Sequence, residues 1–143
     1  MRYFIDTNIF LRLLIKEDEK TYSQCYKLLS AVKTNQIKAV TSSITLAEIV
    51  WTLLSYYKFP KRKVVRAVKS ILNLKGVKII DAYNPSVSLE LFDKYTVKYI
   101  DTLIASVKKI ADKKWIVVSY DRDFDKLAIE RKEPHEILEQ MVN

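Results

Sequence analysis

Short apolar segments alternate with longer segments of helical periodicity along the whole chain, and this alternation restricts the possible folds more than any other feature. The apolar segments predict strands at residues 2–5, 37–41, 77–80 and 115–119, with a weaker strand at 129–132. Strands that alternate with helices favour a parallel sheet, because each crossover places a helix on one of its faces. We therefore expect a three-layer α/β fold, in which a central, mostly parallel sheet of four to five strands is covered by helices on both faces.

Helices are predicted where apolar residues recur every three or four positions. They span about residues 9–14, 17–33, 42–57, 61–75, 86–98 and 101–111, with a short turn near 124–127 and a helical tail after 134. In the fourth helix the residues expected to face inward are Val64, Val65, Val68, Ile71 and Leu72. Gly76 stands where a glycine that ends this helix belongs. Cys25 falls in a helical series of apolar residues, which predicts a buried side chain and not a reactive thiol.

The length of the chain, 143 residues, is usual for one domain, and no linker or repeat divides it. We expect a single domain over residues 1–143. No apolar run approaches the ~20 residues of a membrane-spanning helix, and Asp6 interrupts the N-terminal apolar stretch too early for a signal peptide. With a single cysteine, no internal disulfide can form. A cytoplasmic protein without a membrane partner is therefore expected.

Four carboxylates stand where predicted strands end or predicted helices begin. Asp6 and Asp121 follow the first and fourth strands, Asp101 follows an apolar segment, and Glu48 lies one helical turn beyond the second strand. Parallel α/β sheets place their ligand crevice at the carboxyl ends of the strands, so these four side chains are expected to meet. Like charges repel strongly unless a cation lies among them. The sequence therefore predicts a site for a divalent metal ion.

Each of these acids also has a local explanation. Asp6 and Asp101 could cap helices, Thr45 and Glu48 have the spacing of a capping box, and Asp121 lies in a stretch that would pass for an acidic turn. Local capping does not explain why four acids fall at equivalent ends of one sheet. We therefore prefer the metal site.

The charge of the chain indicates a partner of opposite sign. There are 25 lysine and arginine residues against 17 aspartate and glutamate residues, a formal net charge of +8. A basic exterior around an acidic cleft suits nucleic acid, although a lysine-rich surface of thermophile type is the alternative. A basic stripe at helical spacing is predicted to bind nucleic acid, with a plain solvated helix face as the alternative; its residues are Lys58, Arg62, Arg66 and Lys69.

The acids belong to a set of motifs that covers essentially the whole chain. In order, the motifs are Asp6-Thr7-Asn8, then Ala47-Glu48, then Asp101-Thr102 with Ala105 four residues on, and finally Ser119-x-Asp121-x-Asp123-Phe124. Each motif is short, but the ordered set is fairly specific. It resembles the PIN domain, and in particular the VapC toxins, the ribonuclease halves of type II toxin–antitoxin pairs. One departure is the poor fifth strand after Phe124.

The resemblance implies a chemistry and a role for each matching residue. It implies metal-dependent cleavage of single-stranded or loop RNA that leaves a 5′-phosphate, with an antitoxin protein as partner. Mg²⁺ or Mn²⁺ would be held by Asp6, Asp101 and Asp121. Glu48 would complete the catalytic set, by holding a second ion or by orienting the attacking water. The supporting residues would be Thr7, Asn8, Ser119 and Asp123.

Other functions remain open at this stage. A phosphoacceptor receiver domain also gathers acids at strand ends, but it needs an acidic pair near the first strand, where this chain has Asp6-Thr7-Asn8. An RNA-processing nuclease of the same fold would carry an identical site. A non-catalytic module that binds RNA or protein would be expected to lack one of the acids, and none is missing. His135, the only histidine, is interpreted as a helix-start residue and not as a general base.

The predicted helix over residues 42–57 is apolar around most of its circumference. Only Glu48, Thr52 and Ser55 interrupt the apolar residues after its first turn, and these three fall on one narrow stripe. A helix that covers a single sheet needs an apolar arc of only a little over ~100°. The surplus is rich in Trp and Tyr, which is typical of a protein interface. We therefore expect a homodimer, with complete burial of this helix by the chain's own neighbours as the alternative.

Overall fold

The computed structural model describes all residues from 1 to 143 and contains one sheet of five strands. The strand order is β3-β2-β1-β4-β5, and every neighbouring pair is parallel. The strands are β1 Arg2–Ile5, β2 Lys38–Thr41, β3 Val77–Ile79, β4 Trp115–Val118 and β5 Arg131–Lys132. The chain proceeds from β1 to one edge and then returns to the other side of β1. The point where the order reverses, beside β1, is where such sheets place their ligand crevice.

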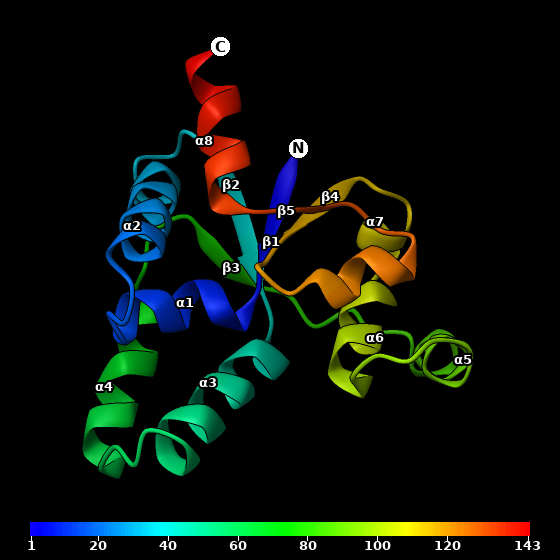
Figure 1. Cartoon of the computed structure of the whole chain (residues 1–143), viewed down its shortest axis with the longest axis horizontal. Helices are drawn as coiled ribbons and strands as arrows, with labels where there is room; N and C mark the ends of the chain where they lie inside the picture. The colour runs from blue at the N-terminus through cyan, green and yellow to red at the C-terminus, as the bar shows by residue number, and fades with distance from the viewer.

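Helices cover both faces of the sheet, as the sequence predicts (Figure 1). Figure 1 shows α1, α2 and α8 on one side of the strands, and α5, α6 and α7 on the other. The helices are α1 Thr7–Leu14, α2 Glu19–Lys33, α3 Ser43–Ser55, α4 Lys61–Leu72, α5 Pro85–Lys94, α6 Tyr99–Ala105, α7 Lys108–Ala111 and α8 Pro134–Val142, with a 3₁₀ helix η1 at Arg122–Leu127. None of them is both long enough and apolar enough to cross a membrane.

Two hydrophobic cores fill the spaces between the sheet and its helical layers. Because successive strand residues point to opposite faces, Phe4 and Ile5 of β1 enter different cores. Ile5 packs with α1 to α4 and α8, and this core also holds Cys25, which is fully buried as predicted. Phe4 packs with α6, α7 and η1. The central strand is therefore buried on both faces, and its carboxyl end is firmly positioned.

Several predicted element boundaries were wrong. The helix expected over 101–111 is two helices, because Val107 is extended and Ser106 ends α6 by donating a hydrogen bond to the Leu103 carbonyl at 2.6 Å. The same Ser106 Oγ accepts from the Asn84 backbone N–H at 2.9 Å. The helices expected to reach residues 75 and 98 end at Leu72 and Lys94.

Two residues expected to face inward from α4 are exposed. Val65 and Leu72 are 44% and 51% exposed, whereas Val64 and Ile71 are buried. Val65 and Leu72 lie on the side of α4 that forms a shallow groove with α3, of about 320 Å³, and no further element covers that groove. Helical periodicity shows which residues form the apolar face of a helix, but not how much of that face is covered by other elements. It therefore assigned Val65 and Leu72 to the core.

Gly76 does not end α4, whose C-cap is Asn73. It lies in the turn before β3 with a φ of +94°, and a Cβ added there would be 2.5 Å from the Val32 carbonyl oxygen. Both the backbone conformation and the close approach of α2 therefore require glycine at this position.

Replacing Gly76 with alanine is predicted to destabilise the fold. A left-handed conformation costs an alanine about 1 kcal/mol, and the contact with Val32 adds to this cost. The free energy of unfolding should fall by about 1–3 kcal/mol in urea denaturation. The adjacent and exposed Lys75→Ala serves as the control and should be close to neutral. Equal stability of the two variants would contradict the constraint at Gly76.

Candidate metal centre

Asp6 is the first residue after β1 and is 5% exposed. It occupies the N-cap position of α1, but its side chain makes no capping hydrogen bond, so the capping explanation does not account for it. Instead, Asp6 Oδ2 accepts from Ser119 Oγ at 2.7 Å and from Asn8 Nδ2 at 3.4 Å. The pKa of Asp6 is raised to about 6, mainly by burial and also by the charge of Glu48, against the opposing effect of the Ser119 hydrogen bond.

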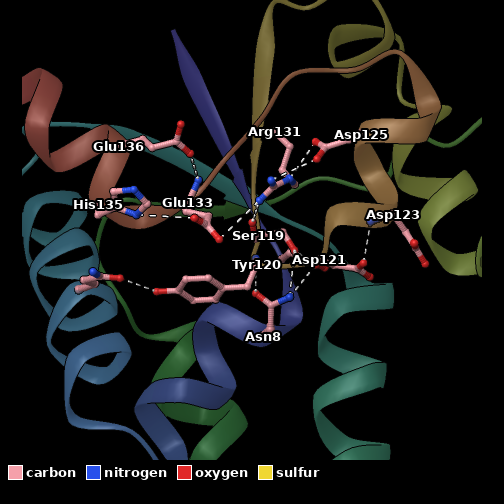
Figure 2. Close-up of polar contacts among 12 residues, drawn as sticks. Asn8, Ser119, Tyr120, Asp121, Asp123, Asp125, Arg131, Glu133, His135 and Glu136 are labelled. Atoms are coloured by element: carbon pink, nitrogen blue, oxygen red, sulfur yellow. Dashed lines mark hydrogen bonds and ion pairs between the residues drawn. The ribbon is translucent and has the colours of Figure 1, made fainter.

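Asn8 and Ser119 join the ends of β1 and β4 into one polar network. Asn8 Nδ2 donates to Ser119 Oγ at 2.9 Å, and Asn8 Oδ1 accepts from the Tyr120 backbone N–H at 3.2 Å (Figure 2). Ser119 Oγ also accepts from the Asp121 backbone N–H at 3.0 Å. These contacts fix the carboxylate of Asp6 and the backbone of Asp121 relative to one another.

Glu48 reaches the same end of the sheet from α3. Its Oε1 accepts from Thr7 Oγ1 at 2.7 Å. The predicted capping alternative was wrong, because α3 begins after Ser42, whose side chain accepts from the Thr45 N–H at 3.3 Å. Thr7 therefore positions Glu48, while Asn8 and Ser119 position Asp6.

Asp101, like Asp6, is almost completely buried. It lies in the first turn of α6, whose N-cap is Lys98, so Asp101 does not cap this helix. The side chain is 3% exposed, and its Oδ2 is buried without any hydrogen-bond partner. Burial raises the pKa of Asp101, the charges of Asp121 and Asp6 raise it further, and the ammonium of Lys98 opposes them. Buried carboxylate oxygens are normally satisfied, so this one indicates a missing partner.

Asp121 and Asp123 complete the cluster. One carboxylate oxygen from each of Asp101, Asp121 and Asp123 lies within 4.8 Å of the others. Asp121 is the N-cap of η1 and accepts from the Asp123 N–H at 3.0 Å. It therefore lies in an acidic turn, as the alternative explanation for this residue predicted. Burial pushes the pKa of Asp121 upward, but the Asp123 N–H and the Lys98 ammonium outweigh it and hold this pKa below its usual value. The closest trio thus includes Asp123, which the sequence assigned only a supporting role.

Two lysines at the site were not predicted. Lys98 Nζ lies 3.2 Å from Asp121 Oδ2, and Lys126 Nζ lies 3.1 Å from Asp123 Oδ1. The available signal was the position of Lys98 one helical turn before Asp101. Arg131 was also missed, and its guanidinium donates to the Ser119 carbonyl at 2.9 Å and to Asp125 (Figure 2).

His135 lies outside the acid cluster. It is within the first turn of α8, as expected of a helix-start residue, and its ring lies beside Glu133 (Figure 2). The distance from His135 Nδ1 to Glu133 Oε2 is 3.7 Å.

The basic stripe is not part of the acid cluster. Arg62, Arg66 and Lys69 are exposed on α4, and α3 lies between α4 and α6 in Figure 1. Lys58 is not on this helix at all, because it lies in the turn before α4 with a φ of +57°. The placement of Lys58 on a common helical stripe was therefore wrong.

The donor set fits a small divalent cation that prefers oxygen ligands. Carboxylates are the protein ligands that Mg²⁺ and Mn²⁺ select. Asp101, Asp121 and Asp123 lie together, the charge of Asp6 acts on Asp101, and the charge of Glu48 acts on Asp6. Only two lysines oppose these acids, and one buried oxygen of Asp101 has no partner. A cation among these oxygens would satisfy Asp101. It would also compensate for the burial, and for the neighbouring negative charges, that raise the pKa of Asp6 and of Asp101.

The metal-free protein is predicted to lose stability as the pH rises from about 5 to about 8. Asp6 and Asp101 have pKa values above the ordinary 3.8, so in this window the folded state binds more protons than the unfolded state. The free energy of unfolding therefore decreases as the pH rises. The stability that protonated Asp6 contributes is lost once the pH passes its folded-state pKa of about 6. Asp81, whose pKa is lowered, affects stability only at more acidic pH.

Melting temperatures measured by circular dichroism in EDTA test this dependence. Asp101→Asn should show a shallower decrease with pH than the wild type, and Mn²⁺ should raise the wild-type melting temperature most at the alkaline end. A wild-type melting temperature that stays level or rises across the window would contradict the role given to the buried acids.

Comparisons with known proteins agree with this fold. The PIN domain family model matches residues 3–130. Two solved structures have a TM-score of 0.68: VapBC2 from Rickettsia felis bound to a DNA fragment from their promoter, and PAE2754 from Pyrobaculum aerophilum. The first is 23% identical and covers 93% of this chain and 98% of that chain. The second is 12% identical and covers 99% of this chain and 96% of that chain.

A third structure is VapC20 from Mycobacterium tuberculosis, a sarcin-ricin loop cleaving toxin, with a TM-score of 0.60, 18% identity and coverage of 89% of this chain and 95% of that chain. We found no significant sequence match among curated proteins. At these identities the structures establish a shared fold, and the family model covers most of the sequence. The chain therefore belongs to the PIN domain family and has a VapC-like fold.

Proposed function

We propose that this chain, acting as one domain over residues 1–143, is an endoribonuclease that depends on Mg²⁺ or Mn²⁺. The observation that carries the proposal is the buried and unpartnered Oδ2 of Asp101 beside Asp121 and Asp123. We assign Asp6, Asp101 and Asp121 as metal ligands. Asp123 supports them from the start of η1.

Different side chains of the site have different roles in the hydrolysis. When bound, the metal ion lowers the pKa of a water molecule and offsets the negative charge that develops on the phosphoryl group. Glu48 is held by Thr7 through one oxygen, which leaves its other oxygen free to orient the attacking water. Water oxygen bonds to phosphorus as the bond to the 3′ oxygen breaks, so the downstream product carries a 5′-phosphate. Asn8 and Ser119 keep Asp6 in place.

RNA is the proposed substrate because the chain carries a net positive charge and because a structural relative is described as cleaving RNA. A net charge of +8 attracts a polyanion toward an acidic site that would otherwise repel it. Among the structural relatives, VapC20 is described as cleaving the sarcin-ricin loop, which is RNA. We further propose that Arg62, Arg66 and Lys69, exposed on α4, attract the RNA at a distance from the acids.

We also propose that the chain is the toxin of a toxin–antitoxin pair. VapBC2 from Rickettsia felis, which shares the fold, is a complex of this kind. An apolar groove of about 300 Å³ between α1, α2 and α4 offers a place for an antitoxin segment, with Lys33 at its edge for an acidic contact. Its apolar lining includes Leu13, Leu14, Tyr26 and Leu74.

A homodimer through α3 completes the proposal. Trp51 and Tyr56 are 71% and 76% exposed, while Ile49 and Leu53 on the other side of α3 are buried. Beside Trp51, an apolar hollow of about 520 Å³ extends to α6, where Ile100 and Leu103 line it. Exposed aromatic residues next to such a hollow are typical of an interface. Glu48 also lines this hollow, so a second copy would form one wall of the acid site.

Asp101→Asn is predicted to abolish metal-dependent RNA cleavage without unfolding the protein. The amide keeps the shape of the side chain but removes the buried charge that binds the ion. The loss should exceed the about 10–100-fold that removal of an outer-shell partner costs. Asp93→Asn, an exposed acid on α5, is the matched control and should cleave like the wild type. Full activity of Asp101→Asn in Mn²⁺ would disprove the site.

Light scattering should give twice the chain mass of 16.8 kDa at micromolar concentration. Trp51→Glu places a charge on the exposed side of α3 and should give a folded monomer, whose circular dichroism spectrum matches that of the wild type. Tyr26→Glu, an exposed aromatic residue on α2, is the control and should leave the dimer intact. A wild-type protein of monomer mass across the micromolar range would refute the dimer.

A further inference from the structure

Lys98 lies at the open side of the acid cluster and has no role in the mechanism above. Its backbone is fixed as the N-cap of α6, because its carbonyl accepts from the N–H groups of Asp101 at 3.1 Å and Thr102 at 3.3 Å. The side chain takes no part in capping and extends to Asp121, with Nζ 3.2 Å from Oδ2. It is 63% exposed, so solvent and a ligand can reach it.

The positive charge of Lys98 acts on more than its ion-pair partner. It acts on Asp6 and Asp101 as well as on Asp121, and it is itself influenced by Glu48. Lys126, the other lysine at the site, pairs with Asp123 on the far turn of η1. Lys98 is thus the lysine that contacts Asp121 and whose charge acts on all four acids of the proposed metal centre.

Folding stability does not explain this placement. Exposed ion pairs contribute little to stability, since solvent screens them and two long side chains must be ordered. Lys108 and Asp112 form an ordinary pair of this kind at 2.8 Å on the surface of α7. Lys98 differs because its partner, Asp121, is only 22% exposed and belongs to the acid cluster.

We propose that Lys98 is a substrate-contacting residue whose ammonium leaves Asp121 and donates to a non-bridging oxygen of the phosphodiester that is cut. This inference rests on the proposed ribonuclease function. An RNA phosphate brings a further negative charge toward four acids and Asp123, and one divalent ion does not offset them all. A lysine on a flexible stem can supply the additional positive charge, both for phosphate binding and for the charge that develops during cleavage.

Lys98→Met tests the inference, with Lys98→Arg as the charge-conserving variant and Lys108→Met as the control. The first readout is the initial rate of cleavage of a mixed-sequence pool of single-stranded RNA in Mn²⁺. Lys98→Met should be about 10²-fold slower, as expected for loss of one group that stabilises the transition state. Lys98→Arg should recover part of the rate, and Lys108→Met should match the wild type.

The second readout is binding without cleavage, with fluorescein-labelled single-stranded RNA and Ca²⁺ in place of Mn²⁺. Loss of one phosphate contact should reduce the slope of log affinity against log salt by about 0.7 for Lys98→Met and leave it unchanged for Lys108→Met. The third readout is Mn²⁺ affinity by calorimetry in the absence of RNA. Lys98→Met should bind Mn²⁺ at least as tightly as the wild type, because Lys98 does not hold the ion.

The outcomes separate this inference from the proposed function. If the wild type cleaves RNA and Lys98→Met has the same rate and the same salt slope, Lys98 is only a counter-ion of Asp121 and the inference is overturned. It is also overturned if Lys98→Met no longer binds Mn²⁺, since a damaged metal site would then explain any loss of cleavage. If the wild type neither binds nor cleaves RNA, the ribonuclease proposal itself fails.

Discussion

Repulsion among the carboxylates at the ends of β1 and β4, of which Asp6 and Asp101 are buried and Asp121 is half-buried, is the interaction on which the rest of this structure depends. The strand order places β1 at the centre, and the Asp6 N–H donates to the Val118 carbonyl at 3.1 Å, so the two strand ends meet. The helix α6 then brings in Asp101 almost without solvent contact. A sequence that was selected only for stability would not leave Asp101 Oδ2 buried and unpartnered among like charges. A bound cation would resolve that conflict.

The surrounding polar residues hold the repelling groups in place. Ser119 and Asn8 fix Asp6 from β4 and α1, while Thr7 fixes Glu48 from the start of α1. Each contact joins segments far apart in the sequence, so the positions of the acids depend on the complete sheet. Side chains held in this way would need little rearrangement to bind an ion, and a bound ion would also stabilise the fold.

The strands, and the positions of the two acids that follow them, were predictable because their signals are local. An apolar run that ends in aspartate identifies both a strand and its carboxyl end, as Asp6 and Asp121 show. The break between α6 and α7 was not predicted from periodicity, because Ser106 Oγ ends α6 at the Leu103 carbonyl and is also held by the N–H of the distant Asn84. The constraint on Gly76 likewise comes from a carbonyl of α2.

The sequence did not show which of the acids lie closest together, because this depends on the three-dimensional arrangement of the chain. Asp123 is in the closest trio with Asp101 and Asp121 because the η1 turn folds its carboxylate back toward them. Lys98 could have been noticed from its position one turn before Asp101, but a lysine in a lysine-rich chain carries no signal by itself. The groove between α3 and α4, which exposes Val65, depends on what packs around α4.

A crystal structure of the wild-type protein with Mn²⁺, in which the ion is located by its anomalous scattering, tests the central claim most directly. The account predicts a strong peak within bonding distance of Asp101 Oδ2, shared with an oxygen of Asp121 and absent from the Asp101→Asn variant. Mn²⁺ bound only elsewhere, for example at the exposed carboxylate of Asp125, or no peak at the ends of β1 and β4, would contradict it.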